Sequence, residues 1–270
     1  MSNLDLLKKL IKIESISPND NGCFDVIKQQ FEGLDFSFEE TSYKNISNLV
    51  ITNGNSKNKT FCFLGHTDVV PPGPESEWTV PPFSGEIIDN KIYGRGAADM
   101  KGGVACFISA LKEFLSEYKD PSFNIMVLLN SNEEGKLENG KVDRVINEMI
   151  DKDKFIDFCL IGEPSSSKKV GDVIRIGRRG SLSGNLKVYG IQGHVAYPKQ
   201  ALNPILGMGK TLEELKNMEW DLGNENFEPT SFQVSNIKSG TGAENVVPGV
   251  LEMTFNFRFS PESSPDGLKE

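Results

Sequence analysis

Short apolar runs that end beside a histidine or acidic residues constrain the fold of this chain more than any other feature. The three runs are typical of β-strands because they are rich in β-branched or aromatic residues and are bounded by Gly, Asn and Ser. They span residues 60–64, 124–129 and 158–161. Directly after them come, in the same order, His66 and Asp68, Glu133 and Glu134, and Glu163. The fold must therefore position three strand ends that carry imidazole or carboxylate groups.

Helical spacing between these runs predicts an α/β fold. Apolar residues recur at helical intervals over residues 102–118, and a shorter pattern of the same kind spans residues 142–150. Another strand is predicted at residues 48–52. Strands separated by helices indicate a mostly parallel sheet that is covered on both faces. Ligands bind beyond the carboxyl ends of such strands, so we expect the polar groups to meet at one edge of the sheet.

The sequence pattern changes after about Gly177. The expected elements are a strand, a helix and two strands, at residues 182–189, 203–218, 231–237 and 251–259. This order is the beginning of a ferredoxin-like α+β unit. We therefore predict a catalytic metal-binding domain over residues 1–178. An inserted lid or dimerisation domain, incomplete at its end, is predicted over residues 179–270.

Composition excludes several classes of protein. The net charge of −9 argues against nucleic acid as the main partner. The longest wholly apolar runs, such as residues 125–129, are far too short to cross a bilayer, so no membrane partner is expected. Charged residues within the amphipathic helix at the start argue against a signal peptide, and a cytoplasmic location is expected. The cysteines show no C-x-x-C spacing and are expected to be buried free thiols.

The histidine and the carboxylates together indicate a metal site that activates water. The imidazole of His66 can bind a metal through one nitrogen while Asp68 accepts a hydrogen bond from the other. A loop histidine that forms a salt bridge with Asp68 is the alternative. No G-x-S-x-G motif is present, which disfavours a serine hydrolase.

The remaining acidic candidates have alternatives of their own. Asp99 lies in a glycine-dense loop that opens a helix, and the spacing of this loop does not fit a phosphate-binding motif. Its carboxylate can bridge two cations or simply cap the helix. Of the adjacent Glu133 and Glu134, one can bind a metal while the other handles a proton, although an exposed acidic turn would look the same.

Five segments resemble the di-zinc aminoacylase/carboxypeptidase superfamily, and the likeness extends along essentially the whole chain. They are GHTDVVP at 65–71, WTVPPF at 78–83, YGRGAADMKGG at 93–103, EEG at 133–135 and GEP at 162–164. The resemblance implies a zinc exopeptidase-like catalytic domain and two Zn²⁺ or Co²⁺ ions. It also implies that His66, Asp99 and Glu163 hold one ion. Asp99 would bridge to a second ion, which Glu134 would also bind.

The resemblance implies catalytic roles for three further residues. Glu133 would be the general base that takes a proton from water and later delivers it to the leaving amine. Asp68 would orient His66. His194, from the lid of a partner subunit in a homodimer, would stabilise the oxyanion, whereas the sequence alone favours an ordinary polar residue at a strand end.

Further motifs at 177–184, 192–198 and 240–249 resemble the branch of this superfamily that hydrolyses N-succinyl-LL-2,6-diaminopimelate. That small molecule carries three carboxylates, and arginine recognises carboxylates bidentately. The resemblance therefore implies a substrate-binding role for Arg178, Arg179, Arg258, Tyr197 and Asn245. For any one of the arginines, a surface charge is the alternative. The alternatives are a deacetylase of acetylornithine and an inactive metal-binding or dimerising fragment.

The sequence departs from the superfamily pattern in two places. Asn132 stands where an aspartate commonly precedes the glutamate pair, and no histidine follows His194, although the superfamily has a last zinc-binding histidine near its C-terminus. We therefore expect a fragment of a longer enzyme, with an open second metal site and an incomplete substrate pocket.

Overall fold

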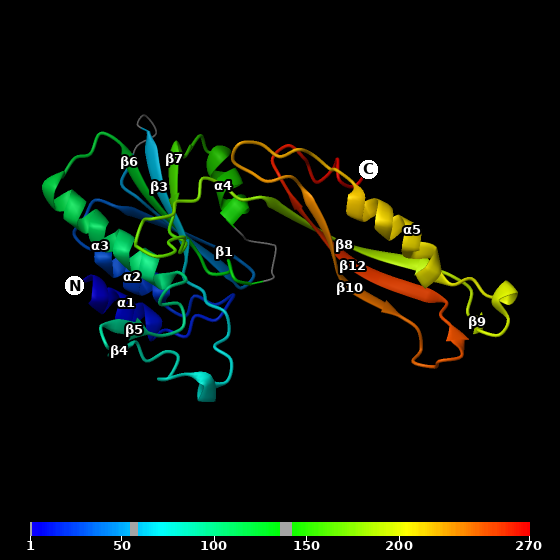
Figure 1. The fold of residues 1–270 in the computed structure, drawn as a ribbon. Coiled ribbons are helices and arrows are strands. Elements are labelled where there is room, and N and C mark those ends of the chain that lie inside the picture. Colours follow the sequence, from blue (N-terminus) through cyan, green and yellow to red (C-terminus); the bar gives the residue numbers. More distant parts are fainter. Residues whose placement is uncertain (1, 55–58, 136–141) are drawn as a thin grey trace. The chain divides into compact units, whose positions relative to one another are not determined.

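The structure, a computed structural model, describes residues 2–54, 59–135 and 142–270 (Figure 1). The chain forms two compact units, Met1–Asp172 and Val173–Glu270. The predicted metal-site residues all belong to the first unit, and the predicted substrate-binding residues belong to the second.

A five-stranded mixed sheet forms the centre of the first unit, in the order β1-β2-β6-β3-β7. Its strands are β1 (Ser37–Tyr43), β2 (Ile46–Thr52), β3 (Thr60–His66), β6 (Asn124–Asn130) and β7 (Phe158–Ile161). Strand β3 pairs in parallel with β6 and with β7. The pairs β1–β2 and β2–β6 are antiparallel. The prediction of a mostly parallel sheet was therefore wrong for this half of the sheet.

A tight turn explains the antiparallel β1–β2 pair. Only Lys44 and Asn45 connect β1 to β2, and Lys44 adopts a positive φ of 58°. A connection of two residues can join only antiparallel strands, because a parallel pair needs a long crossover. The same device joins β4 (Glu86–Ile88) to β5 (Lys91–Tyr93), a hairpin that the sequence analysis also missed.

Helices cover both faces of the sheet, as predicted (Figure 1). One face packs against α1 (Asn3–Ile11), α2 (Cys23–Lys28) and α3 (Lys101–Glu117), and the other packs against α4 (Val142–Ile150). Successive residues of β2 point to opposite faces, so that Leu49 and Ile51 join the first core and Val50 joins the second. The sheet is therefore held in place from both sides.

A buried lysine fixes the start of α3. Lys101 is fully buried, and its Nζ donates hydrogen bonds of 2.8 Å to the carbonyl oxygens of Leu10 and Ile13. These carbonyls lie at the C-terminal end of α1, where helix carbonyls lack intrahelical partners and favour a cation. This contact anchors the loop that carries Asp99 to α1.

The second unit contains a three-stranded antiparallel sheet in the order β10-β12-β8. Its strands are β8 (Gly180–Tyr189), β10 (Ser231–Ser239) and β12 (Val250–Phe259). Helix α5 (Pro204–Asn217) packs on this sheet through Met208, which contacts Leu251 and Met253. A small ladder joins β9 (Gly193–His194) to β11 (Val246–Val247). The predicted order of strand, helix, strand and strand is present.

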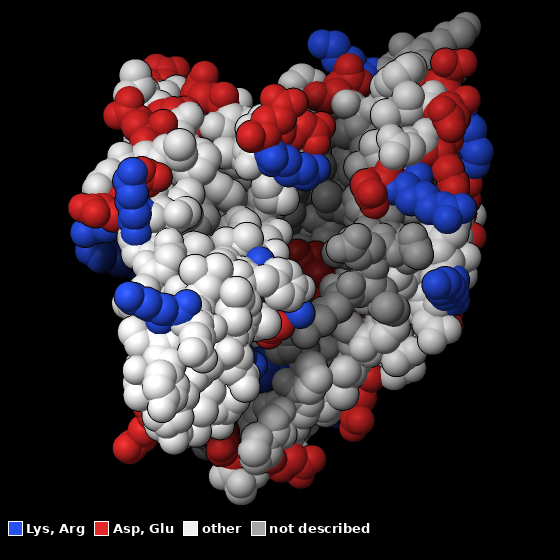
Figure 2. Space-filling model, turned by 90° about the vertical axis from the view of Figure 1, so that its right-hand side faces the viewer, with Lys and Arg blue, Asp and Glu red and all other residues white. Residues whose placement is uncertain are grey.

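Two of the four cysteines are exposed, although all were predicted to be buried. Cys23 and Cys62 are buried free thiols, but Cys106 and Cys159 are exposed, the latter on the edge strand β7. On the face shown in Figure 2, acidic and basic side chains lie mostly in small separate groups among uncharged atoms. In the described ranges, no helix has the length and apolar character needed to span a membrane.

We predict that Ile108→Ala lowers the free energy of unfolding by about 2–5 kcal/mol, because it opens a cavity in the core between α3 and the sheet. Ile108 is fully buried there. The matched control is Ile150→Ala, at a residue that is 46% exposed and should cost about 1 kcal/mol or less. Urea denaturation measures both values, and equal losses would contradict this assignment of the core.

Candidate metal centre

The imidazole of His66 is almost fully buried at the carboxyl end of β3, and its two nitrogens face different partners. Nδ1 lies 2.9 Å from the carbonyl oxygen of Asp68 and 3.4 Å from its Oδ1. Nε2 lies 3.2 Å from Oδ1 of Asp99 and 3.4 Å from Oε1 of Glu163. A proton on Nδ1 would bond to Asp68, which leaves the lone pair of Nε2 directed toward the acidic groups.

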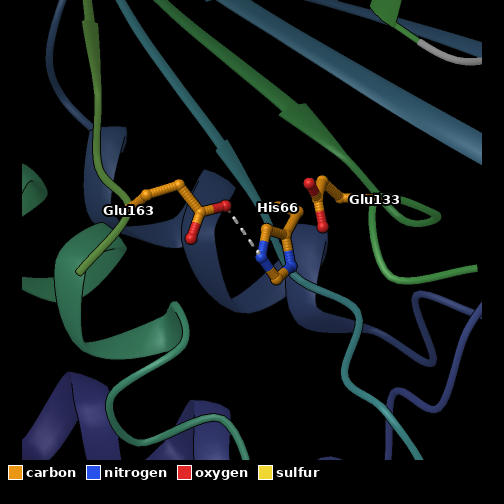
Figure 3. Close-up of side chains that lie close together, drawn as sticks. All are labelled: His66, Glu133 and Glu163. Atoms are coloured by element: carbon orange, nitrogen blue, oxygen red, sulfur yellow. Dashed lines mark ion pairs between the residues drawn. The ribbon is translucent and has the colours of Figure 1, made fainter. Parts of the chain in front are cut away.

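The acidic residues that follow the strands converge on His66. Two groups have ligand atoms that all lie within 4.8 Å of one another, namely His66 with Glu133 and Glu163, and His66 with Asp99 and Glu134. Figure 3 shows the carboxylates of Glu133 and Glu163 on either side of the His66 ring, each from the segment after its own strand. The structure thus brings together five of the predicted residues from four separate parts of the chain.

Two glycines allow this convergence. A Cβ on Gly103 in α3 would lie 2.4 Å from the carbonyl oxygen of Gly162, and a Cβ on Gly162 would lie 2.5 Å from the ring of Phe63. Both distances are shorter than real Cβ contacts, so larger residues would push the first turn of α3 away from the end of β7. The glycines therefore keep Asp99 close to Glu163.

The carboxylate of Asp68 is fully buried and has four neighbouring donors. Its Oδ1 accepts from the backbone N–H of Glu133 at 3.1 Å and lies near His66 Nδ1. Its Oδ2 accepts from the backbone N–H of Glu134 at 3.1 Å and from the hydroxyl of Ser17. One buried side chain thus connects the histidine to the backbone of both glutamates.

This arrangement shifts the pKa of both members of the His66–Asp68 pair. Burial lowers the pKa of His66, but the hydrogen bonds and charge of Asp68, together with the charge of Glu163, outweigh it and raise the pKa to about 9. Burial likewise raises the pKa of Asp68, but the hydrogen bonds from His66 and Ser17 outweigh it, so the net pKa falls. Without a metal ion, the pair is therefore a buried imidazolium and carboxylate over the neutral pH range.

Two other carboxylates have raised pKa values. For Glu134 the causes are burial and then the charge of Asp99. For Glu163 burial is again the largest cause, and Asp99 and Glu133 contribute through like charge. Like charges held this close destabilise one another unless a cation lies between them. The donor set of one imidazole nitrogen and several carboxylate oxygens suits Zn²⁺ or a similar divalent ion.

The sequence analysis missed the residues whose side chains form hydrogen bonds with the loop after His66. Ser15 donates from its hydroxyl to the carbonyl oxygen of Thr67 at 2.7 Å. Asp20 accepts from the hydroxyl of Thr67 at 3.0 Å and from the backbone N–H groups that open α2. Only the position of Asp20 just before a helix could have signalled a cap. These contacts cross about fifty residues of sequence, and no local pattern reports them.

Three predicted residues of the second unit lie together around β9 and β11. His194 pairs with Val246, and its ring centroid is 5.8 Å from that of Tyr197. The carbonyl oxygen of Asn245 accepts from the backbone N–H of Val195 at 3.1 Å. His194, Tyr197 and Asn245 are exposed and lie beyond the Tyr189 end of β8.

The three arginines lie at the opposite end of the same sheet. Arg178 and Arg179 directly precede β8, and Arg258 pairs with Ser181 at its start. Arg179 donates to the carbonyl oxygen of Pro229 at 3.3 Å, whereas Arg178 and Arg258 are exposed. The length of β8 is about 30 Å at the rise of an extended strand. Within one copy of this unit, the arginines and the His194 group therefore do not meet.

Residues 62–264 match peptidase family M20/M25/M40. The chain belongs to this family. The match covers the ends of β3, β6 and β7 and the Asp99 loop. The superfamily resemblance of the sequence motifs is thereby confirmed.

Several curated relatives of this M20 chain share one name. Proteins from Methylococcus capsulatus and Psychromonas ingrahamii, both named succinyl-diaminopimelate desuccinylase, are 49% and 50% identical to it. The alignments cover 98% and 96% of this chain and 70% and 68% of the relatives. The chain therefore spans about 70% of the length of these relatives.

Solved structures share the M20 fold at low sequence identity. The aminopeptidase PepT of Bacillus cereus has a TM-score of 0.68 at 17% identity, over 99% of this chain and 69% of its own. The metallo-carboxypeptidase Sso-CP2 of Sulfolobus solfataricus has a TM-score of 0.64 at 20% identity, over 100% of this chain and 74% of its own. These likenesses support the fold of the M20 chain.

We predict that zinc affinity of the metal-free M20 chain rises by about tenfold per pH unit between pH 6.5 and pH 9 and then levels off. His66 is protonated below its raised pKa of about 9, and Nε2 must lose this proton before it can bind a metal. Competition with a chelator of known affinity, repeated at each pH, measures the effect. An affinity that stays constant over this range would contradict a role for His66 as ligand.

Proposed function

We propose that the chain belongs to a metal-dependent amide hydrolase that converts N-succinyl-LL-2,6-diaminopimelate and water into succinate and LL-2,6-diaminopimelate. This reaction serves lysine and diaminopimelate biosynthesis. The observation that carries the proposal is the similarity to six curated relatives with that desuccinylase name. They are 46–50% identical over 96–100% of this chain. Identity at this level over nearly the whole chain, together with the assembled carboxylates, supports the same chemistry.

The proposed metal ligands are His66, Asp99 and Glu163 for one Zn²⁺ ion, with Asp99 shared by a second ion that Glu134 also binds. Co²⁺ is the alternative metal. The contacts of His66 Nε2 with Asp99 and Glu163, at 3.2 and 3.4 Å, support the first set. When bound, such ions lower the pKa of a water molecule and polarise the substrate carbonyl.

Glu133 is the proposed general base. Its carboxylate takes one proton from the attacking water as the C–O bond forms. It delivers that proton to the nitrogen of the leaving diaminopimelate as the amide C–N bond breaks. Its backbone N–H is held by the buried carboxylate of Asp68, which gives the base a fixed position beside His66. Asp68 also fixes the orientation of the imidazole through Nδ1.

The second unit is the proposed lid and substrate-binding domain. Arg178, Arg179 and Arg258 would bind the carboxylates of the substrate, with Tyr197 and Asn245 as further contacts. The clustering of these arginines at one end of the sheet supports a common pocket for an anionic ligand.

A homodimer through the second unit would bring His194 of one subunit to the site of the other, where it stabilises the oxyanion. The separation of His194 from the arginines along β8 supports this arrangement, because one copy cannot use both groups at one site. Exposed apolar side chains of this unit, among them Leu202, Ile205 and Leu206, offer an interface. A cytoplasmic location stays a prediction.

We predict that the zinc-loaded full-length protein releases succinate from N-succinyl-LL-2,6-diaminopimelate and hydrolyses N-acetylornithine far more slowly. The arginines match a substrate with three carboxylates, and the acetyl compound leaves part of this pocket unused. Initial rates of amide hydrolysis on both substrates measure the preference.

Two outcomes would contradict this assignment. Acetate release without succinate release would favour the deacetylase. Tight zinc binding without hydrolysis of either amide would favour a metal-binding or dimerising protein that lacks turnover.

We predict different losses for the two adjacent glutamates. Glu133→Gln lowers kcat by about 10²–10⁴-fold and leaves zinc content unchanged, because the amide cannot accept the proton from water. Glu134→Gln lowers the zinc content per chain, because the amide is a poorer ligand than the carboxylate. Turnover and metal analysis of the two purified variants test this, and the reverse pattern would exchange the two roles.

A further inference from the structure

The segment from Ser15 to Asp20 clamps the loop that follows β3, although about fifty residues separate them in the sequence. Backbone hydrogen bonds run from Ser17 N–H to the carbonyl of Val69 and from Val69 N–H to the carbonyl of Ser15, at 3.1 and 2.9 Å. Ile16 forms a parallel bridge with Val69. These bonds place the hydroxyl of Ser17 directly against the carboxylate of Asp68.

We propose that Ser17 is a positioning residue of the metal centre, whose hydroxyl fixes the rotation of the Asp68 carboxylate and, through it, both His66 and the backbone of the glutamate pair. The inference rests on the proposed metal-dependent function. It adds a residue outside the ligand set and assigns it a single chemical task.

The hydrogen bonds around Asp68 support this task. The carboxylate is fully buried, so its oxygens depend on protein donors. Oδ1 faces His66 Nδ1 and the N–H of Glu133, while Oδ2 accepts from the N–H of Glu134 and from Ser17. Loss of the hydroxyl would leave Oδ2 with one of its two donors. The carboxylate would then be free to turn away from the imidazole and from the turn that carries both glutamates.

The hydroxyl of Ser17 also lies 3.4 Å from the carbonyl oxygen of Val69, but the backbone–backbone hydrogen bonds of the clamp do not involve it. Ser17→Ala therefore removes the donor to Asp68 while these backbone bonds to Val69 remain. The variant therefore tests the positioning of Asp68 apart from the attachment of residues 15–20 to the loop after β3. Loss of a group that orients a metal-binding histidine or its carboxylate partner typically weakens metal affinity by about 10–100-fold.

Zinc affinity of the full chain, measured by chelator competition at fixed pH, tests the inference. Ser17→Ala should bind zinc about 10–100-fold more weakly than wild type. Ser17→Thr, which keeps the hydroxyl, should stay within about threefold of wild type. The Co²⁺ absorption spectrum should change in the alanine variant and not in the threonine variant, because it reports ligand geometry.

Ser37→Ala is the matched control. Its hydroxyl donates to the backbone carbonyl oxygen of Thr52 and is exposed on β1. Ser37 pairs with Thr52, and Thr52 pairs with Met126, nearer the start of β6. His66 pairs with Asn130 at the end of β6, so Ser37 lies toward the opposite end of the sheet from the metal centre. The zinc affinity of the Ser37→Ala variant should equal that of wild type.

Wild-type affinity in Ser17→Ala, or an equal loss in the alanine and threonine variants, would overturn the proposal. If the alanine variant does not fold, Ser17→Cys replaces it. Its weaker S–H donor should give an affinity below that of Ser17→Thr, and equal affinities would overturn the proposal. Failure of the wild-type chain to bind zinc would instead overturn the proposed metal centre itself.

Discussion

The in-register parallel pairing of β7, β3 and β6 is the constraint on which the rest of the site depends. His66 lies opposite Asn130 in the β3–β6 ladder, and Leu64 lies opposite Ile161 in the β3–β7 ladder. Chains that leave parallel strands at the same level enter the same space beyond the sheet, so their next polar residues meet there. A register shift of one residue would turn His66 to the other face of the sheet and separate the ligand atoms.

Bringing several carboxylates together around one imidazole costs free energy, because like charges repel. The fold offsets this cost with hydrogen-bond donors that are held in fixed positions. The buried Asp68 receives the N–H groups of both glutamates and the Ser17 hydroxyl, which keeps it charged and stationary. Within the described part of the chain, Glu134 and Glu163 have no comparable set of donors, and burial beside Asp99 raises their pKa values. The centre therefore combines a rigid inner pair with carboxylates whose repulsion a divalent ion would relieve. This combination gives a physical reason for the grouping of acidic residues at one sheet edge.

Much of this centre could be predicted from sequence because local patterns encode it. Apolar runs mark the strands, and polar residues directly after them mark the sheet edge. Strand β1 was missed because most of its side chains are exposed, including Ser37 and Glu39, and no alternation of apolar residues marks it. The contacts of Ser17 and Asp20 depend on tertiary packing, which no window of sequence reports. In the proposed homodimer, the relation of Arg178 to His194 depends on contacts between subunits, and this too has no local pattern.

Zinc-edge anomalous diffraction from crystals of the zinc-loaded protein tests the central claim most directly. The account predicts a peak about 2.0–2.2 Å from His66 Nε2 and from carboxylate oxygens of Asp99 and Glu163. A second peak is expected about 3.5–4 Å from the first, on the side of Asp99 that faces Glu134. Zinc bound at a site that excludes Asp99 and His66 would contradict the account.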